Sequence, residues 1–212
     1  MAQYFDAHPS AVSELREVNI MVDGRAYRLW SDNGVFAKRG LDIGTSVFLE
    51  CLLKKAELRS ELESVKGRAL DLGCGIGIIA IVLQGYLPQL KFSAVDINER
   101  AVSLAKRNVQ ASGLDIPVHV SDGFSALKEE EFSLIVSNPP IRIGKQPLYR
   151  LIADAYAHLA PCGLMFLVVG KKQGAESLQK YCAELAGDCD SVGHASGFKV
   201  LRLRKAEEVI YG

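Results

Sequence analysis

Residues 68–203 alternate between short apolar segments, typical of buried strands, and longer amphipathic segments, typical of helices. This alternation predicts an α/β fold: a doubly wound, mostly parallel, seven-stranded sheet with helices on both faces. Ligands bind such sheets beyond the carboxyl ends of the strands, so polar residues at those ends are candidates for a site. The predicted strands are Arg68–Leu72, Lys91–Asp96, Val118–Ser121, Phe132–Ser137, Leu164–Gly170, Cys189–His194 and Phe198–Leu203, and the predicted helices are Ile78–Leu87, Asn98–Ser112, Leu148–Leu159 and Gln173–Leu185.

The length of 212 residues suits a single domain, residues 1–212, with a sizeable core. We divide it into an N-terminal cap, residues 1–60, and a core, residues 61–212, that carries the alternating pattern. The cap is predicted to lean over the ligand-binding end of the sheet as a lid. Its predicted elements are a hairpin of strands Val18–Val22 and Arg25–Trp30 joined at Asp23-Gly24, and a helix from Thr45 to about Leu58.

Charge and cysteine content exclude several classes of protein. The chain has 25 basic and 25 acidic side chains, so bulk charge does not bind it to nucleic acid, and any RNA contact requires a local basic face. No apolar run reaches the roughly 18 residues of a membrane span. The five cysteines are scattered without a C-x-x-C pair, which predicts reduced thiols in a cytoplasm and no metal site.

A glycine-rich stretch, Leu70-Asp71-Leu72-Gly73-Cys74-Gly75-Ile76-Gly77, lies between a predicted strand and a predicted helix. Glycine at alternate positions lets the chain turn sharply and lets a ligand approach the bare backbone. The glycines alone leave two other interpretations open: a tight turn without a ligand, and the dinucleotide fingerprint G-x-G-x-x-A. Asp71 argues against the fingerprint because its carboxylate would repel a pyrophosphate and attract a cation. S-adenosylmethionine (SAM), which carries an ammonium and a sulfonium and no phosphate, meets that requirement.

Four polar residues end or follow four of the predicted strands: Asp71, Asp96, Asp122 and Asn138. Asp96 is placed to accept hydrogen bonds from both hydroxyls of a ribose, although an aspartate there also caps a following helix. Asp122 is able to accept a hydrogen bond from an adenine amino group, although Asp-Gly is also a common turn. Four such residues at successive strand ends predict a nucleoside-binding site.

The segment Asn138-Pro139-Pro140-Ile141 follows the fourth predicted strand. Its prolines lack N–H donors and stiffen the turn, which leaves carbonyl groups free to accept. The Asn138 side-chain oxygen and the Pro139 carbonyl are therefore predicted to accept one hydrogen bond each from the two N–H groups of a planar amine. These bonds would hold the nitrogen in line with a methyl donor. A plain loop punctuated by two prolines is the alternative interpretation.

The glycine-rich stretch resembles motif I of the class I SAM-dependent methyltransferases, and Asn138–Ile141 resembles motif IV of those that methylate planar nitrogens. The resemblance extends furthest to the RsmC-like (MTS domain) methyltransferases of the guanine 2-amino group in ribosomal RNA. It implies a Rossmann-like fold, SAM as the cofactor, and Asn138 and Pro139 as catalytic residues. The other matching stretches are Asp32–Phe36, Leu41–Thr45, Val95–Ala101, Ser121–Phe124, Ser137–Lys145 and Lys171–Ala175. The cofactor-binding residues that it implies are Thr45, Asp71, Gly73, Gly75, Gly77, Asp96, Ile97, Asp122, Gly123 and Asn138.

The chain departs from the family pattern at two points. Ile141 stands where many planar-nitrogen methyltransferases have an aromatic residue that stacks on the base, which leaves Arg142 or Phe36 as candidates for that contact. Longer family members have two related domains, whereas this chain has the length of one. The residues predicted to contact RNA are Phe36, Lys38, Arg39, Ile141, Arg142, Lys145 and Lys171, with Arg150 and Lys172 as further basic residues near the expected substrate mouth.

The sequence therefore predicts a cytoplasmic SAM-dependent methyltransferase that acts on an exocyclic guanine amine. Its expected partner is small-subunit (16S) ribosomal RNA or the small ribosomal subunit, with no membrane and no metal. Two alternatives stay open: methylation of a protein glutamine amide or a small-molecule amine, and non-catalytic SAM binding by an RNA or assembly factor. Convergence of the basic loop residues would favour RNA over the other acceptors, and Asn138 argues against the non-catalytic alternative.

Overall fold

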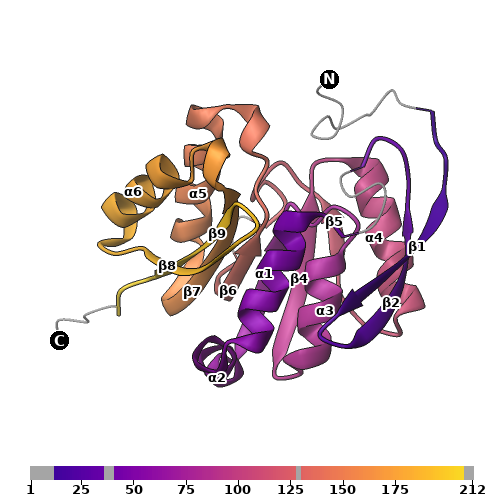
Figure 1. Ribbon diagram of the computed structural model, residues 1–212, viewed down its shortest axis with the longest axis horizontal. Coiled ribbons are helices and arrows are strands. Elements are labelled where there is room, and N and C mark those ends of the chain that lie inside the picture. The colour runs from indigo at the N-terminus through magenta and orange to yellow at the C-terminus, as the bar shows by residue number, and fades with distance from the viewer. Residues whose placement is uncertain (1–11, 36–40, 128–129, 208–212) are drawn as a thin grey trace.

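The computed structural model describes residues 12–35, 41–127 and 130–207, and its main feature is a seven-stranded sheet (Figure 1). The strand order is β5-β4-β3-β6-β7-β9-β8. β9 is antiparallel to both of its neighbours, and the other pairs are parallel. The strands are β3 (Gly67–Leu72), β4 (Leu90–Asp96), β5 (Val118–Val120), β6 (Phe132–Ser137), β7 (Leu159–Gly170), β8 (Asp190–Ala195) and β9 (Phe198–Arg204). The predicted doubly wound, mostly parallel sheet is confirmed.

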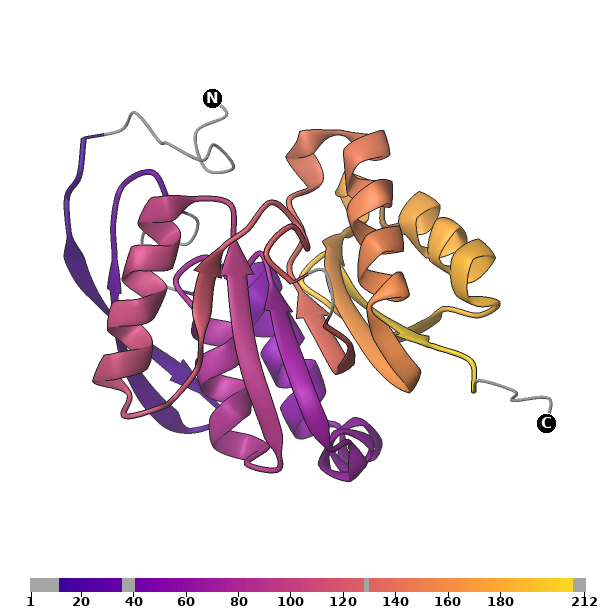
Figure 2. The same cartoon turned by 180° about the vertical axis from the view of Figure 1, so that it is seen from behind.

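Helices cover both faces of the sheet, with α1, α3 and α4 on one face and α5 and α6 on the other (Figures 1 and 2). Each face has its own apolar core because side chains alternate along a strand: Ala69 packs in the first core and Leu70 in the second. The helices are α1 (Ile43–Lys54), α2 (Ala56–Ser64), α3 (Ile78–Tyr86), α4 (Glu99–Ala111), α5 (Lys145–Ala157) and α6 (Ala175–Ala186), with short 3₁₀ turns at Ile141–Ile143 and Lys171–Gln173. None of the helices in the described ranges is long and apolar enough to cross a membrane.

The N-terminal hairpin consists of β1 (Arg16–Val22) and β2 (Arg25–Ser31), joined by the predicted two-residue turn at Asp23-Gly24. Both turn residues have positive φ, 47° and 75°, which matches the twist of a tight hairpin. The hairpin packs against α3 and α4, and the Tyr86 hydroxyl at the end of α3 donates to Asp23 at 3.0 Å (Figure 1). Of the cap, residues 1–60, the first turn of α1 lines the cavity at the carboxyl ends of the strands, whereas the hairpin has its apolar side chains buried in the first core.

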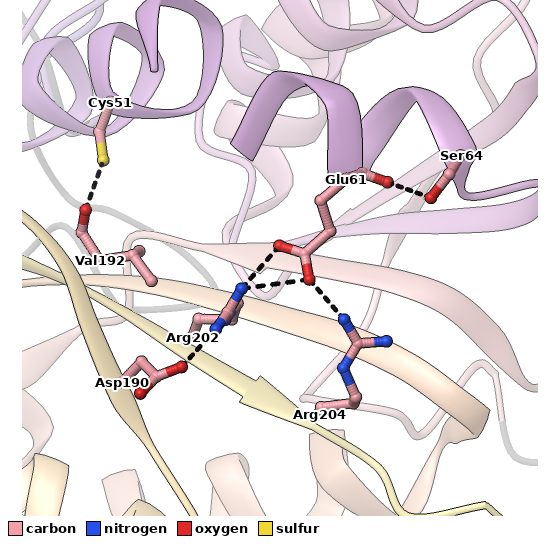
Figure 3. A network of polar contacts seen from close by, with 7 residues as sticks. All are labelled: Cys51, Glu61, Ser64, Asp190, Val192, Arg202 and Arg204. Carbon is pink, nitrogen blue, oxygen red and sulfur yellow. Dashed lines mark hydrogen bonds and ion pairs between the residues drawn. The ribbon is translucent and has the colours of Figure 1, made fainter. Parts of the chain in front are cut away.

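The single helix predicted after Thr45 is two helices in the structure. Lys55, with φ −80° and ψ 115°, is extended and separates α1 from α2. The break lets α2 lie beside the end of β9, where Glu61 forms ion pairs with Arg202 and Arg204 (Figure 3). No glycine or proline marks this break, so the helical pattern gave no reason to expect it.

Two further boundaries differ from the prediction. α5 begins at Lys145 rather than Leu148, directly after Gly144, whose φ of 100° favours glycine. β7 already begins at Leu159, where a helix end was predicted, and its pairing with β6 shifts register in its first half. Cys162 has a φ of 60° within that irregular part of β7.

Candidate active site

A cavity of about 1020 Å³ opens at the carboxyl ends of the parallel strands, at the crevice between β3 and β6 where the strand order reverses. Its wall comes from the glycine loop after β3, the ends of β4 and β6, the first turn of α1, one side of α5 and the start of β9. The predicted site residues that line it are Thr45, Gly73, Gly75, Asp96, Ile97, Asp122, Gly123, Asn138, Pro139, Ile141, Arg142 and Arg150.

Several predicted site residues do not line the cavity. Those that the structure describes are Asp71, Gly77, Lys145, Lys171 and Lys172. Phe36, Lys38 and Arg39 lie outside the described residues, so their contacts stay predictions. Of the basic residues expected at the substrate mouth, Arg142 and Arg150 reach the cavity wall, whereas the described lysines remain on the exposed surface beside it.

The glycine loop is fixed by its own hydrogen bonds. The N–H groups of Gly73 and Cys74 both donate to the Val95 carbonyl at 2.9 Å, and the Gly75 N–H donates to Asp96 Oδ2 at 2.8 Å. Gly75 has a φ of 54°, and no atom lies within 4 Å of the position that a Cβ would occupy. The loop therefore presents bare backbone to the cavity, as close approach of a ligand requires.

Gly77 and Asp71 lie behind that loop. A Cβ at Gly77 would be 3.2 Å from Ala105 Cβ, so this glycine serves the packing of α3 on α4 rather than ligand contact. Asp71 is fully buried, and its Oδ2 accepts the Ala80 N–H in the first turn of α3 at 3.0 Å. The structure thus gives Asp71 no direct contact with a ligand in the cavity. Its carboxylate occupies the helix N-terminus at which a pyrophosphate would bind, which is a stronger argument against a dinucleotide than repulsion at a distance.

Asp96 lies on the cavity wall between the glycine loop and α4. In addition to the Gly75 N–H, its carboxylate accepts the Asn98 N–H at 2.9 Å. Burial raises the pKa of Asp96, and these N–H donors oppose that rise. The cap of α4 is Asn98, which accepts from Arg100 and Ala101, so the alternative interpretation of Asp96 as the helix cap is wrong. With the Ile97 N–H, three backbone donors bind this carboxylate, which leaves a lone pair for a ribose hydroxyl.

Asp122 is exposed just beyond the end of β5, in a turn that faces α5. Gly123 has a φ of 55°, and the Ser121 hydroxyl donates to its carbonyl at 2.8 Å. Leu151 of α5 lies 3.3 Å from the position of a Gly123 Cβ and also lines the cavity. A carboxylate beside an apolar wall matches the edge and the face of an adenine ring.

Asn138 is bound to the first turn of α1. Its Nδ2 donates to Thr45 Oγ1 at 3.0 Å and to Asp42 Oδ1 at 3.4 Å. Because a carboxylate accepts and does not donate, the amide turns its NH₂ group toward Asp42, and its oxygen has no donor among the described residues and is left as an acceptor. The Thr45 hydroxyl accepts from Asn138 and so keeps its own proton for an acceptor in the cavity. Asp42 also caps α1 through the Thr45 N–H at 3.1 Å, which fixes the helix and the Asn138 corner to each other.

The Pro139 carbonyl is only partly free. It accepts the Ile141 N–H at 2.9 Å, which leaves one lone pair for the single substrate N–H that it is predicted to accept. Arg142 lies in the short turn that this bond begins and is exposed at the cavity wall. The Lys145 Nζ lies 5.3 Å from the centre of the Tyr149 ring, so this lysine lies along α5 rather than in the cavity.

Among the residues of the cavity wall to which the sequence pattern gave no role are Asp42, Gln173 and Phe198. Asp42 had a usable pattern, because an aspartate directly before an apolar helical segment is typical of an N-cap. Gln173 follows β7 and Phe198 begins β9, so both are distant in sequence from the glycine loop, and no local pattern connects them with it.

The sheet order, the antiparallel β9 and the cavity at the switch point together define the class I methyltransferase fold. The chain belongs to the methyltransferase small domain (MTS) family, whose model matches residues 26–202.

Similar proteins include both shorter and longer chains. YbxB, an uncharacterized protein of Bacillus subtilis, is 29% identical over 95% of this chain and 98% of its own. Ribosomal RNA small subunit methyltransferase C of Shewanella amazonensis is 32% identical over 81% of this chain and 48% of its own. The structure of 16S rRNA methyltransferase RsmC of T. thermophilus, in complex with AdoMet and guanosine, has a TM-score of 0.80 and 27% identity over 93% of this chain and 52% of that one. The chain thus spans about half the length of the RsmC relatives it matches and nearly all of YbxB.

Proposed function

We propose that this protein transfers a methyl group from SAM to the exocyclic 2-amino group of a guanine in small-subunit (16S) ribosomal RNA. The observation that carries the proposal is the Asn138 amide, whose NH₂ group is held by Thr45 and Asp42 so that its oxygen is left to accept from an amine. Membership of the MTS family and the names of the RsmC relatives support the reaction and the class of acceptor. The free state of all five cysteines supports a reducing cytoplasm as the place of action.

The residues of the cavity fit SAM. Gly75 presents bare backbone, Asp96 has a lone pair for a ribose hydroxyl, and the turn at Asp122 offers an acceptor beside an apolar wall. The Thr45 hydroxyl has a proton for a carboxylate, and Asp71 already fills the helix N-terminus that a pyrophosphate would need. When bound, SAM supplies a methyl group on a positively charged sulfur.

The chain's own residues position the acceptor amine. Asn138 Oδ1 and the remaining lone pair of the Pro139 carbonyl accept hydrogen bonds from the two N–H groups of the amine. These bonds draw the nitrogen lone pair out of conjugation with the base and turn it toward the cofactor side of the cavity. No side chain has to act as a nucleophile, so catalysis rests on positioning and on acceptors that are fixed before the substrate arrives. The hydrogen bonds from Asn138 to α1 supply that fixed geometry.

Tritiated-methyl transfer from SAM to 30S subunits and to naked 16S RNA, followed by nucleoside analysis, tests the proposal. We expect label in N2-methylguanosine. Label in ribosomal protein, or in a nucleoside other than a guanosine methylated at N2, would contradict it and would favour the alternative acceptors.

Asn138→Ala tests the chemistry. We expect the variant to bind S-adenosylhomocysteine within a few fold of the parent but to lose about 10²-fold or more in single-turnover rate, because the missing acceptor acts on the reacting amine. Asn138→Asp keeps an acceptor of the same size and should retain more activity than the alanine variant. Methyl transfer by Asn138→Ala at the parental rate would remove Asn138 from the mechanism.

A further inference from the structure

One aromatic ring lines the cavity among the residues that the structure describes, and it belongs to Phe198 at the start of β9. A planar acceptor base is held most effectively by a flat side chain against its face. The position directly after Pro140, where planar-nitrogen methyltransferases often place an aromatic residue, is Ile141 in this chain. Phe198 has the chemistry that Ile141 lacks, and it comes from a different part of the sheet.

The contacts of Phe198 place its ring beside the Asn138 corner. Its Cε1 lies 2.9 Å from the position that a Cβ at Gly44 would occupy, and Asp42 Oδ1 lies 3.1 Å from the same position. The ring edge and the Asp42 carboxylate thus both lie against Gly44, and this carboxylate accepts from Asn138. Only a residue without a side chain at position 44 allows the ring to lie there.

The start of β9 is itself well fixed. Phe198 pairs with Gly170 at the end of β7, and the Lys171 N–H donates to the Gly197 carbonyl at 2.7 Å. The ring is partly buried and packs on the first core, with the rest of its surface toward the cavity. A ring anchored in this way loses little conformational freedom when a base stacks on it.

We propose that Phe198 contacts the acceptor base: its ring stacks on the base and holds the exocyclic amine against the free oxygen of Asn138. This inference rests on the proposed function, in which the acceptor is a guanine. It assigns the start of β9 to the acceptor half of the cavity, opposite the half that Asp96 and Asp122 form for the cofactor. It also gives Gly44 a reason to be glycine, because a methyl group there would push the ring away.

Phe198→Leu, with Phe198→Tyr as the conservative control, tests the inference. We expect Phe198→Leu to lower kcat/KM for RNA by about tenfold or more, mainly through KM, while S-adenosylhomocysteine affinity and the unfolding midpoint stay near the parental values. Phe198→Tyr should remain within about threefold of the parent. Tyr149→Leu, which removes an aromatic ring outside the cavity, serves as the matched control.

The outcomes separate this inference from the proposed function. Parental kcat/KM in Phe198→Leu would overturn the inference and leave the proposed reaction intact. A parallel loss of cofactor affinity in this variant would also overturn the inference, because it would show that the ring contacts the cofactor instead of the base. Calorimetric titration with guanosine, with S-adenosylhomocysteine already bound, needs no methyl transfer. If the parent protein fails to methylate RNA but binds guanosine, loss of that binding in Phe198→Leu still supports the stacking contact, and parental binding in the variant overturns it.

Discussion

Asp71 is a carboxyl group that the fold places out of contact with water. Its Oδ1 has no hydrogen-bond partner among the described residues, and its Oδ2 has only the Ala80 N–H. Burial raises the pKa of this carboxyl from an ordinary value of 3.8 to about 7; the Ala80 N–H opposes the rise and the Asp96 carboxylate adds to it. The folded protein therefore holds this proton more tightly than the unfolded chain. Stability should fall as pH rises from about 4 to about 7, by roughly 4 kcal/mol from this group, and level off above.

We expect Asp71→Asn to remove most of that decline, because an amide does not ionise and its oxygen still accepts from Ala80. Urea unfolding at about pH 4.5 and about pH 7.5 measures the effect as a smaller difference in unfolding free energy than in the parent. Asp115→Asn, at an exposed position, should follow the parent. Affinity for S-adenosylhomocysteine should stay within about threefold, since Asp71 does not line the cavity. A variant that declines as steeply as the parent between these pH values would contradict this account.

At the scale of single residues, the sequence predicted site residues at the carboxyl ends of parallel strands and missed one at the start of an antiparallel strand. Asp96 and Asn138 were predictable because the carboxyl ends of parallel strands meet at one edge of a sheet. Phe198 was not, because β9 runs the other way and brings its first residue to that edge. A sequence pattern gives the period of a strand but not its direction in the sheet.

At the scale of elements, all seven strands of the sheet were predicted, and the central strands β3, β6 and β7 have short, continuous apolar runs because both of their faces are buried. The placement of the hairpin was not predicted, because it depends on contacts between residues distant in sequence, among them those of one buried side chain. Asn108 of α4 accepts from the Trp30 N–H at 2.6 Å and donates to the Trp30 carbonyl and to the Ile76 carbonyl of the glycine loop. This one amide pairs with the backbone N–H and carbonyl of Trp30 in β2, as a neighbouring strand would, and it connects the hairpin, α4 and the glycine loop.

We expect Asn108→Ala to lower the free energy of unfolding by about 2–4 kcal/mol, because it removes these hydrogen bonds and leaves the Trp30 N–H buried without a partner. The same change frees the glycine loop at Ile76, so S-adenosylhomocysteine affinity should fall by more than stability alone explains. Urea unfolding and calorimetry measure the two effects. Gln110→Ala, at an exposed position of the same helix, is the control. If the variant is destabilised but binds S-adenosylhomocysteine with parental affinity, the Asn108 hydrogen bonds hold the hairpin without influencing the glycine loop, which would contradict the second half of this prediction.

At the scale of the whole molecule, the charges balance at 25 basic and 25 acidic side chains, so the arrangement of charge decides what the surface binds. Arg142 and Arg150 line the cavity, and Lys145 lies beside it at the start of α5. Asp42 and Asp154 lie on the same wall, so the basic charge of this face rests on Arg142, Arg150 and Lys145. A protein with this distribution binds phosphates locally, next to the reacting group, rather than over its whole surface.

Charge reversal at Arg142 and Lys145, as the double variant Arg142→Glu/Lys145→Glu, should therefore weaken RNA binding and flatten its dependence on salt. The slope of log affinity against log salt should fall by about one for each phosphate that the protein no longer neutralises. Affinity for S-adenosylhomocysteine should stay nearly parental, because neither residue belongs to the cofactor half of the cavity. Lys91→Glu is the control: this exposed lysine lies at the start of β4, and the cavity lies at the other end of the strand. Binding is measured at several salt concentrations by filter retention of labelled 16S RNA. If the double variant and the Lys91 variant bind RNA alike, the Asn138 corner does not face the RNA backbone, and an acceptor without phosphates is favoured.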